Sequence, residues 1–200
     1  MLARSAAYLG DVLLADRCRE GEQEAAAELF RIHQPRVYAV LYRVLGNSPE
    51  IEDLLQDTFI QVFRSLGGYR GEAKLATWID RIAARVAYKH IGKRKRSLKT
   101  AALSGEDFIS AGPAPIDQAV AREGIVRLYR VLDGLSASQR VAFALFEIDG
   151  RTVAEVAALT DCTKTTAKLR IWRGRRAVLK AAQSDPLLAE FLSDVELGAN

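Results

Sequence analysis

The chain has little of what builds a metal centre, a disulfide scaffold or a redox site. Two cysteines, Cys18 and Cys162, and two histidines, His33 and His90, stand among 200 residues, and their spacing matches no metal-ligand motif. A lone cysteine is more often a small buried hydrophobe than a switch. Two cysteines are also too few for a disulfide framework. We therefore expect a protein of a reducing cytoplasm, with no metal and no cofactor.

Long apolar runs and strand patterns are also absent. No stretch approaches the ~18 apolar residues of a membrane span, and Asp11 interrupts the one N-terminal candidate for a signal sequence. No segment alternates apolar and polar residues with a period of two. No Ser-His-Asp or Cys-His arrangement, carboxylate pair or phosphate-binding loop stands out. These absences predict a soluble all-α protein that is not an enzyme and has no small-molecule substrate.

What the chain does have is clustered positive charge. Lys and Arg number 29 against 25 Asp and Glu, for a net charge of +4, and 49% of the residues are hydrophobic, enough to bury the core of one domain or two small ones. One basic block runs over residues 81–99 and another over 164–180. Two such blocks, separated along the chain, indicate two contacts with a polyanion.

Residues 150–178 show the clearest motif. Thr152 and Glu155 have the spacing of a capping box, which predicts a helix from about Val153 to the break at 161–162. Ala154 and Ala158 would let this helix approach a neighbour closely. Thr163 then caps a second helix, whose stripe for packing on the first is Ala167, Ile171, Gly174 and Val178. Two helices joined by so short a turn form a helix-turn-helix, in which the second helix enters the major groove of DNA.

The outward side of that second helix is basic. It carries Thr165, Thr166, Leu169, Trp172, Arg173 and Arg176, flanked by Lys164, Lys168, Arg170 and Arg175. A charged, solvated helix of an ordinary bundle would also be basic on one side. The capped first helix, the short turn and the one-sided cations together favour DNA binding.

The N-terminal half predicts further helices after an arm of residues 1–10. We expect Asp11 to cap a helix over 11–19, a second helix over 22–33, and a third that Pro35 opens and that runs to 45. A fourth begins at Ile51. Its inward positions are Ile51, Leu54, Leu55, Thr58, Phe59, Val62 and Phe63, and its outward positions are Asp53, Gln56, Asp57, Ile60, Gln61 and Arg64. Ile60 is either a stray surface residue or the apolar contact of a docking face.

A loop and a basic helix follow. Residues 67–71 read as a flexible loop that contains Tyr69 and Arg70. In the next helix the expected core positions are Trp78, Ile79, Ile82, Ala83 and Val86, while Arg81, Arg85, Tyr88 and Lys89 gather on another side. Basic residues interleaved with aromatics suit both phosphate contact and base stacking.

The remaining segments complete a two-domain prediction. Residues 97–115 read as a flexible linker, and helices are expected over 116–132 and over 137–148, the latter opened by a capping box of Ser136 and Gln139. A break at 184–186 precedes a last turn over 187–192. The fold class is thus two small helical domains, 11–96 and 116–182, joined by the linker, with a tail of residues 183–200.

Two stretches of the sequence resemble conserved regions of a known family. DLLQDTFIQVFRSL with YRGEAKLATWIDRIAARVAYKHIGKRKR is similar to the second conserved region of bacterial RNA polymerase sigma factors, and GLSASQR with DGRTVAEVAALTDCTKTTAKLRIWRGRR is similar to their fourth. The two regions cover roughly residues 11–96 and 116–181. Nothing corresponds to the first or third region, so the chain resembles the short, extracytoplasmic-function class.

The resemblance implies a role for each surface. Asp53, Gln56, Asp57, Ile60, Gln61 and Arg64 would bind the β′ coiled coil of core polymerase. Tyr69, Arg70, Lys74, Arg81, Arg85 and Lys89 would capture a flipped base and hold the opened strand of the −10 element. Thr165, Thr166, Lys168, Leu169, Arg170, Arg173 and Arg176 would read the −35 duplex. The implied partners are core RNA polymerase, through its β′ coiled coil and β flap, promoter DNA, and an anti-sigma factor, often membrane-bound, which would hold the cytoplasmic protein at the inner membrane.

Two alternatives follow from the residues. One is a freestanding helix-turn-helix regulator that never touches polymerase. The other is a DNA recombinase, for which Ser65 beside Arg64 is the nearest nucleophile. The chain also departs from the family pattern near Thr163 and Thr165, at Phe146 and at Leu169. Leu169 and Trp172 would contact thymine methyl groups or be covered by a partner.

Overall fold

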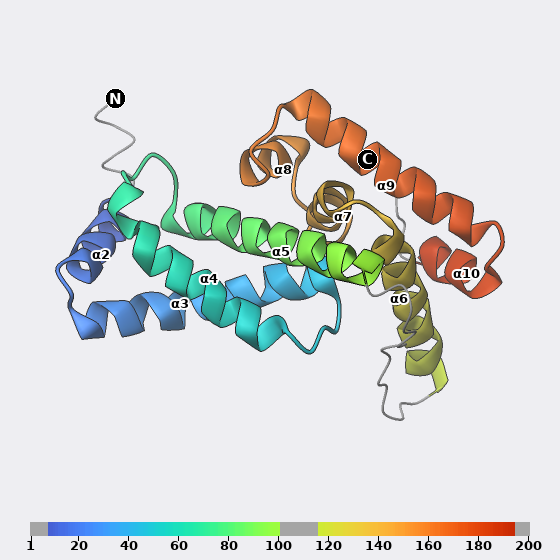
Figure 1. The fold of residues 1–200 in the computed structure, drawn as a ribbon, viewed down its shortest axis with the longest axis horizontal. Helices are drawn as coiled ribbons and strands as arrows, with labels where there is room; N and C mark the ends of the chain where they lie inside the picture. Colours follow the sequence, from blue (N-terminus) through green and yellow to red (C-terminus); the bar gives the residue numbers. More distant parts are fainter. Residues whose placement is uncertain (1–7, 101–115, 195–200) are drawn as a thin grey trace. The chain divides into compact units, whose positions relative to one another are not determined.

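The computed structural model describes residues 8–100 and 116–194, and every regular element in those ranges is helical. Figure 1 shows their order along the chain. The predicted all-α class is confirmed for the described residues. Contacts divide the chain into two compact units, the first built mainly from α2 to the first half of α5 and the second mainly from α6, α7, α9 and α10.

The first unit begins with a short helix and a long one. Helix α2 spans Leu9–Arg19 and packs on α3, which spans Gln23–Leu45. Because α2 begins at Leu9, Asp11 lies inside this helix rather than at its start, where the sequence placed it. The prediction that the N-terminal arm extends to residue 10 is wrong for the same reason; residues 1–7 lie outside the described range.

The prediction of two separate helices around Pro35 is also wrong, because α3 runs through it. Proline cannot donate a backbone hydrogen bond and usually kinks or ends a helix. Here its ring is exposed, and one buried stripe continues past it on the other side of the helix: Ala25, Leu29, His33, Val37, Val40, Leu41 and Val44. Burial of this stripe holds both halves in one helix.

Helix α4, Ile51–Ser65, packs on α3. Ile51, Leu54, Leu55, Thr58, Phe59 and Val62 are buried as predicted. Phe63 is not, because 38% of it is exposed at the edge of the helix. A short turn, η1 (Leu66–Gly68), and a loop lead into α5, Leu75–Thr100. The predicted linker therefore begins too early, since 97–100 are helical; residues 101–115 lie outside the described ranges.

The second unit is built from helices of different lengths. Helix α6 spans Ile116–Gly134, and α7, Ala137–Phe143, continues into the π-helical turn η2, Ala144–Ile148. Both reciprocal hydrogen bonds of the predicted Ser136–Gln139 capping box are present. The predicted α-helix over 137–148 thus changes to π-helical hydrogen bonding at Ala144.

Helix α8, Val153–Leu159, and helix α9, Lys164–Ala182, follow, and then α10, Pro186–Asp194. The sequence predicted only a last turn over 187–192. The structure has a nine-residue helix there, because Leu188 and Leu192 are buried in the core. That core unites Leu128, Leu132, Leu135, Phe143, Val178, Leu188 and Leu192 from α6, the α6–α7 turn, α7, α9 and α10.

Candidate nucleic-acid interface

Side-chain hydrogen bonds fix the starts of α8 and α9. The backbone N–H of Thr152 donates to Glu155 Oε2 at 2.9 Å, and the Glu155 N–H donates to Thr152 Oγ1 at 3.3 Å, which confirms the predicted capping box. The Thr166 N–H donates to Thr163 Oγ1 at 3.1 Å, so Thr163 caps α9 as predicted. Asp161, with a φ of 51°, turns the chain between the two helices. Ala154 and Ala158 are exposed, so the expectation that they pack on a neighbour is wrong.

The inner side of α9 anchors the helix in the second unit. Ala167, Ile171, Gly174 and Val178 are all buried, as their spacing predicted. This stripe faces α7 as well as α6 and α10, whereas the sequence suggested packing on the preceding helix. A Cβ on Gly174 would lie 2.9 Å from Phe143 Cβ, which shows how closely the backbone of α9 approaches α7.

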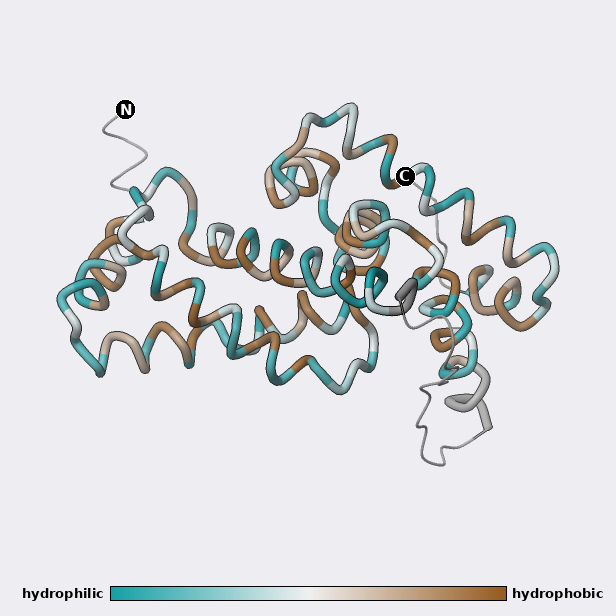
Figure 2. Tube along the Cα trace, in the orientation of Figure 1, coloured by the Kyte–Doolittle hydropathy of each residue, from teal (hydrophilic) through white to brown (hydrophobic). Residues whose placement is uncertain are grey.

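The outer side of α9 is cationic. No Asp or Glu occurs within Lys164–Ala182, and Figure 2 shows polar and apolar residues alternating along the helix. The predicted DNA-contacting residues lie on this side: Thr165, Lys168, Leu169, Arg173 and Arg176 are exposed, and Thr166 and Arg170 are half-buried. The structure therefore brings these seven residues together on one helix.

The structure adds two contacts on this surface. Arg175 is ion-paired through Nε with Glu147 of η2, and its guanidinium lies 5.2 Å from the centre of the Phe146 ring. Its charge is therefore compensated, unlike that of a free surface cation. Arg176 lies over the ring of Trp172, with 5.4 Å between guanidinium carbon and ring centre. No sequence spacing signals the first contact, since the partners are 28 residues apart.

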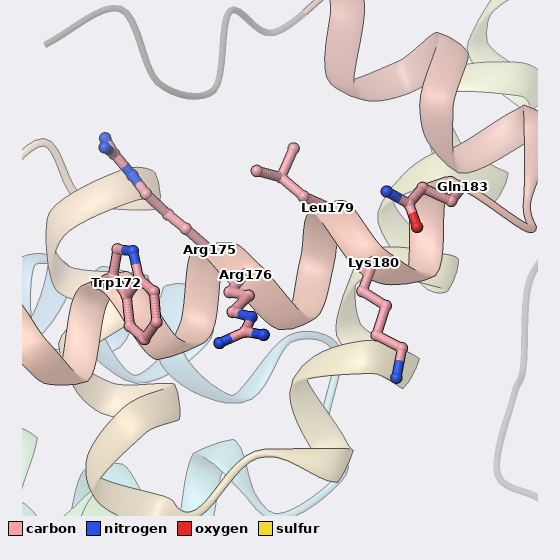
Figure 3. Close-up of a pocket in the computed structure, with 6 residues that line it drawn as sticks. All are labelled: Trp172, Arg175, Arg176, Leu179, Lys180 and Gln183. Carbon is pink, nitrogen blue, oxygen red and sulfur yellow. The ribbon is translucent and has the colours of Figure 1, made fainter.

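A groove runs along the C-terminal half of α9. Its lining is Trp172, Arg175, Arg176, Leu179, Lys180 and Gln183, which project from successive turns in Figure 3. Trp172 is 52% exposed and Leu179 is 57% exposed. Large apolar side chains and cations thus share one surface.

The first unit presents a second candidate surface on α4. Asp53, Gln56, Asp57, Ile60 and Arg64 are exposed and Gln61 is half-buried, as the helical period predicted. Ile60 is 46% exposed. Phe63 at the edge of this face extends the apolar part, since its ring lies 6.3 Å from that of Phe59, which in turn lies 4.6 Å from that of Phe30. Sequence reasoning missed Phe63 because aromatic residues are usually assigned to the core.

The third surface combines the α4–α5 loop with the outer side of α5. Arg70, Lys74, Arg81, Arg85 and Lys89 are all exposed. Tyr69 differs: it is buried, and its hydroxyl donates to the carbonyl of Ala73 at 2.7 Å. Burial raises the pKa of Tyr69 to about 12. The ring lies 5.6 Å from that of Trp78 and so stabilises the loop from within.

Within 8–100 and 116–194, no group of three His, Cys, Asp or Glu side chains is placed to hold a metal ion. Burial raises the pKa of the Cys18 thiol, which lowers the reactivity of that group. No helix in those ranges is long and apolar enough to cross a membrane.

Comparisons with known proteins identify the family of this chain. Family models described as Sigma-70 region 2 and Sigma-70 region 4 match residues 29–97 and 125–178. The chain is 31% identical over 178 residues to the ECF RNA polymerase sigma-E factor of Salmonella typhimurium, with 85% of this chain and 93% of that protein covered. It is 30% identical over 188 residues to the RNA polymerase sigma-H factor of Pseudomonas aeruginosa, with 90% and 96% covered.

Solved structures share the fold. CnrH in complex with the cytosolic domain of CnrY matches with a TM-score of 0.58 at 21% identity, covering 88% of this chain and 98% of that one. The sigma factor RpoE in complex with the anti-sigma factor NepR, from Bartonella quintana, matches with a TM-score of 0.58 at 22% identity, covering 80% and 97%.

Both halves of the chain thus define a protein of the sigma-70 class. The chain belongs to the extracytoplasmic-function (ECF) sigma factors. It binds core RNA polymerase and directs it to promoters, a role that the family performs by binding rather than by catalysis. The alternative of a freestanding regulator that never touches polymerase is therefore wrong.

Proposed function

We propose that the outer face of α9 reads the −35 element as duplex DNA. The observation that carries this proposal is the concentration of exposed cations on α9, a helix without a single carboxylate. The buried stripe on the opposite side of α9 packs this helix into the second unit. Arginine and lysine in the major groove pair with guanine or with phosphate. Thr165, Thr166, Lys168, Leu169, Arg170, Arg173 and Arg176 are the proposed contacts.

Substitution of Arg173 separates base reading from phosphate contact. Loss of a base contact in Arg173→Ala should weaken binding of the preferred −35 duplex by about 1–3 kcal/mol and relax the preference at one base pair. Equal loss for all duplexes, with the salt slope reduced by about one, would identify a phosphate contact instead. Arg130→Ala, which removes an exposed arginine of α6, is the matched control. Unchanged affinity in Arg173→Ala, Arg170→Ala and Lys168→Ala together would refute the proposal.

For the first unit we infer that the α4–α5 loop and α5 hold the −10 element as an opened strand. Arg70 and Lys74 lie on the loop, and Arg81, Arg85 and Lys89 continue the cationic surface along α5. Unstacking a base costs a few kcal/mol, which nearby cations and a receiving surface must offset. Tyr69, being buried, would act by shaping the loop. The proposed first domain runs from α2 into α5, and the second begins with α6 and includes α10, whose Leu188 and Leu192 lie in its core.

We further infer that the outer face of α4 docks on the β′ coiled coil. Exposed Ile60 among Asp53, Asp57 and Arg64 offers an apolar contact with a charged rim, the usual composition of a protein interface. Asp57→Arg should abolish co-elution with core polymerase in gel filtration. Glu24→Arg, an equal charge reversal on the first turn of α3, should leave it intact. Normal holoenzyme formation by Asp57→Arg would refute the docking assignment.

An anti-sigma factor is the proposed regulator. One similar fold was solved with the anti-sigma factor NepR, and another with the cytosolic domain of CnrY. On this chain the groove of Trp172, Leu179 and the adjoining cations offers apolar contact together with positive charge. A membrane-anchored partner would hold the protein at the inner membrane, and its release would free the protein to act in the cytoplasm. Trp172→Ala should weaken capture by a co-expressed partner while holoenzyme assembly persists.

A further inference from the structure

The loop between α4 and α5 is attached to α2, a helix far earlier in the chain. The backbone N–H of Leu75, the first residue of α5, donates to Asp11 Oδ2 at 2.8 Å. The first N–H groups of a helix have no partner within it, and a carboxylate there also interacts favourably with the helix dipole. Asp11 thus caps α5 from 64 residues away in sequence.

A second contact presses the loop itself against α2. Gly71 is buried, and its φ of +68° lies in the left-handed region that favours glycine. A Cβ at this position would lie 2.6 Å from Cγ2 of Val12, the residue after Asp11. The turn η1 also packs on α2. The loop backbone therefore touches α2 at its start and at its middle, and Asp11 fixes its end.

The exposed loop cations lie between these fixed points. Arg70 stands between buried Tyr69 and buried Gly71, and Lys74 directly precedes the capped Leu75. Their side chains are solvent-exposed, whereas the backbone that carries them is anchored on both sides. A surface whose backbone is already ordered loses less conformational entropy when it binds a strand.

We propose that Asp11, supported by Val12, is a positioning residue for base selection in the −10 element. Its carboxylate caps α5 and so fixes the loop that presents Arg70 and Lys74 to the extruded base. This inference rests on the proposed function of the loop as the −10 reader. Asp11 does not touch DNA in this scheme; it acts through the loop.

The test uses holoenzyme assembled from the full chain and core polymerase. A single-stranded oligonucleotide library randomised over the −10 segment is first selected on wild-type holoenzyme. Four oligonucleotides that differ only at the most discriminated position are then titrated. The readout is the affinity for the preferred base divided by the mean affinity for the other three, which a loss of folded protein alone would not change.

Asp11→Ala should lower this ratio by about fivefold, the size of effect that loss of one helix cap has on an equilibrium. Asp11→Asn retains an oxygen acceptor and should restore most of the ratio. Asp16→Ala, on the same helix but paired with Arg19, is the matched control and should leave it unchanged. Val12→Ala keeps the cap, removes the methyl group against Gly71 and should lower the ratio by about twofold.

The outcomes distinguish the inference from the proposed function beneath it. Wild-type ratios in Asp11→Ala and Val12→Ala, alongside reduced ratios in Arg70→Ala and Lys74→Ala, would overturn the positioning role alone. Wild-type ratios in all four variants would show that the loop is not the reader, and both proposals would fall. Should Asp11→Ala holoenzyme not assemble, the ratio in Val12→Ala decides.

Discussion

The ion pair between Arg36 of α3 and Asp80 of α5 is buried on one side only. Arg36 Nε donates to Asp80 Oδ1 at 2.8 Å and Nη2 donates to Oδ2 at 2.7 Å. The Asp80 side chain is 0% exposed, whereas that of Arg36 is 41% exposed. Because only the carboxylate is cut off from water, we expect the two partners to respond differently to truncation.

The magnitudes follow from this difference in burial. Removing one partner of a fully buried pair costs about 3–5 kcal/mol, mostly because the other charge is left without compensation. Arg36→Ala leaves the buried carboxylate without its guanidinium, although water can enter where the arginine was, so we expect a loss of about 2–4 kcal/mol. Asp80→Ala leaves a guanidinium that can turn to solvent and should cost about 1–2 kcal/mol.

The two tryptophans make the measurement specific for one unit. Trp78 lies in the first unit and Trp172 in the second. In a Trp172→Phe background, urea unfolding followed by tryptophan fluorescence reports on the first unit, and an unchanged m-value validates the comparison. Arg31→Ala, an exposed arginine on the same helix, should change stability by less than about 0.5 kcal/mol.

The relative destabilisation of the Arg36→Ala and Asp80→Ala variants tests the argument from one-sided burial. If Asp80→Ala destabilises the first unit as much as Arg36→Ala does, the argument from one-sided burial is wrong. The double variant gives an independent check, since removing both charges should yield a protein more stable than Arg36→Ala alone.

Three further predictions concern single side chains. Gly174→Ala places a Cβ 2.9 Å from Phe143 Cβ, so overpacking should outweigh the helix-propensity gain and lower stability by about 1 kcal/mol, measured by thermal unfolding; a stabilised variant would contradict this. Burial lowers the pKa of His33 below its unfolded-state value of about 6.5, so the free energy of unfolding should be greatest above about pH 6.5 and should decrease as the pH falls toward the folded-state pKa. In urea titrations followed at Trp78, His33→Gln should show a smaller pH dependence of this free energy. An equal pH dependence in both proteins would refute the prediction. Arg175→Ala removes the ion-pair partner of Glu147, so it should lower the free energy of unfolding while leaving the base preference of −35 binding unchanged. A relaxed base preference would contradict the structural role of the Arg175–Glu147 pair.

The sequence predicted the helix faces well where one face is continuously apolar. On α4 and α9 the buried positions follow the helical period, so the outward faces were identified by elimination. The prediction failed at Pro35, where a local rule for proline was overridden by burial of the residues on either side. It also failed for α10, because the burial of Leu188 depends on helices from elsewhere in the unit. Local patterns carry no information about such partners.

The candidate sites show the same limit more sharply. The helical period places Arg173 on the outward face of α9 and Arg175 at its flank, but it does not show which of these cations is ion-paired. The fold makes them different, because the charge of Arg175 is compensated by Glu147 of η2, whereas Arg173 is exposed. Asp11 is the converse case, a residue that looks like the cap of its own helix and instead caps α5.

This difference among cations bears on how binding should depend on salt. Each phosphate contact in duplex DNA contributes about −0.9 to the slope of log affinity against log salt concentration. The slope counts charges that displace counterions, so Arg175, already paired with Glu147, should contribute less than Lys168 or Arg173. If Arg175→Ala reduces the slope as much as Lys168→Ala does, the Arg175–Glu147 ion pair must break when the protein binds DNA. The DNA-contacting face of α9 would then include Arg175 in addition to the cations that are exposed in the free protein.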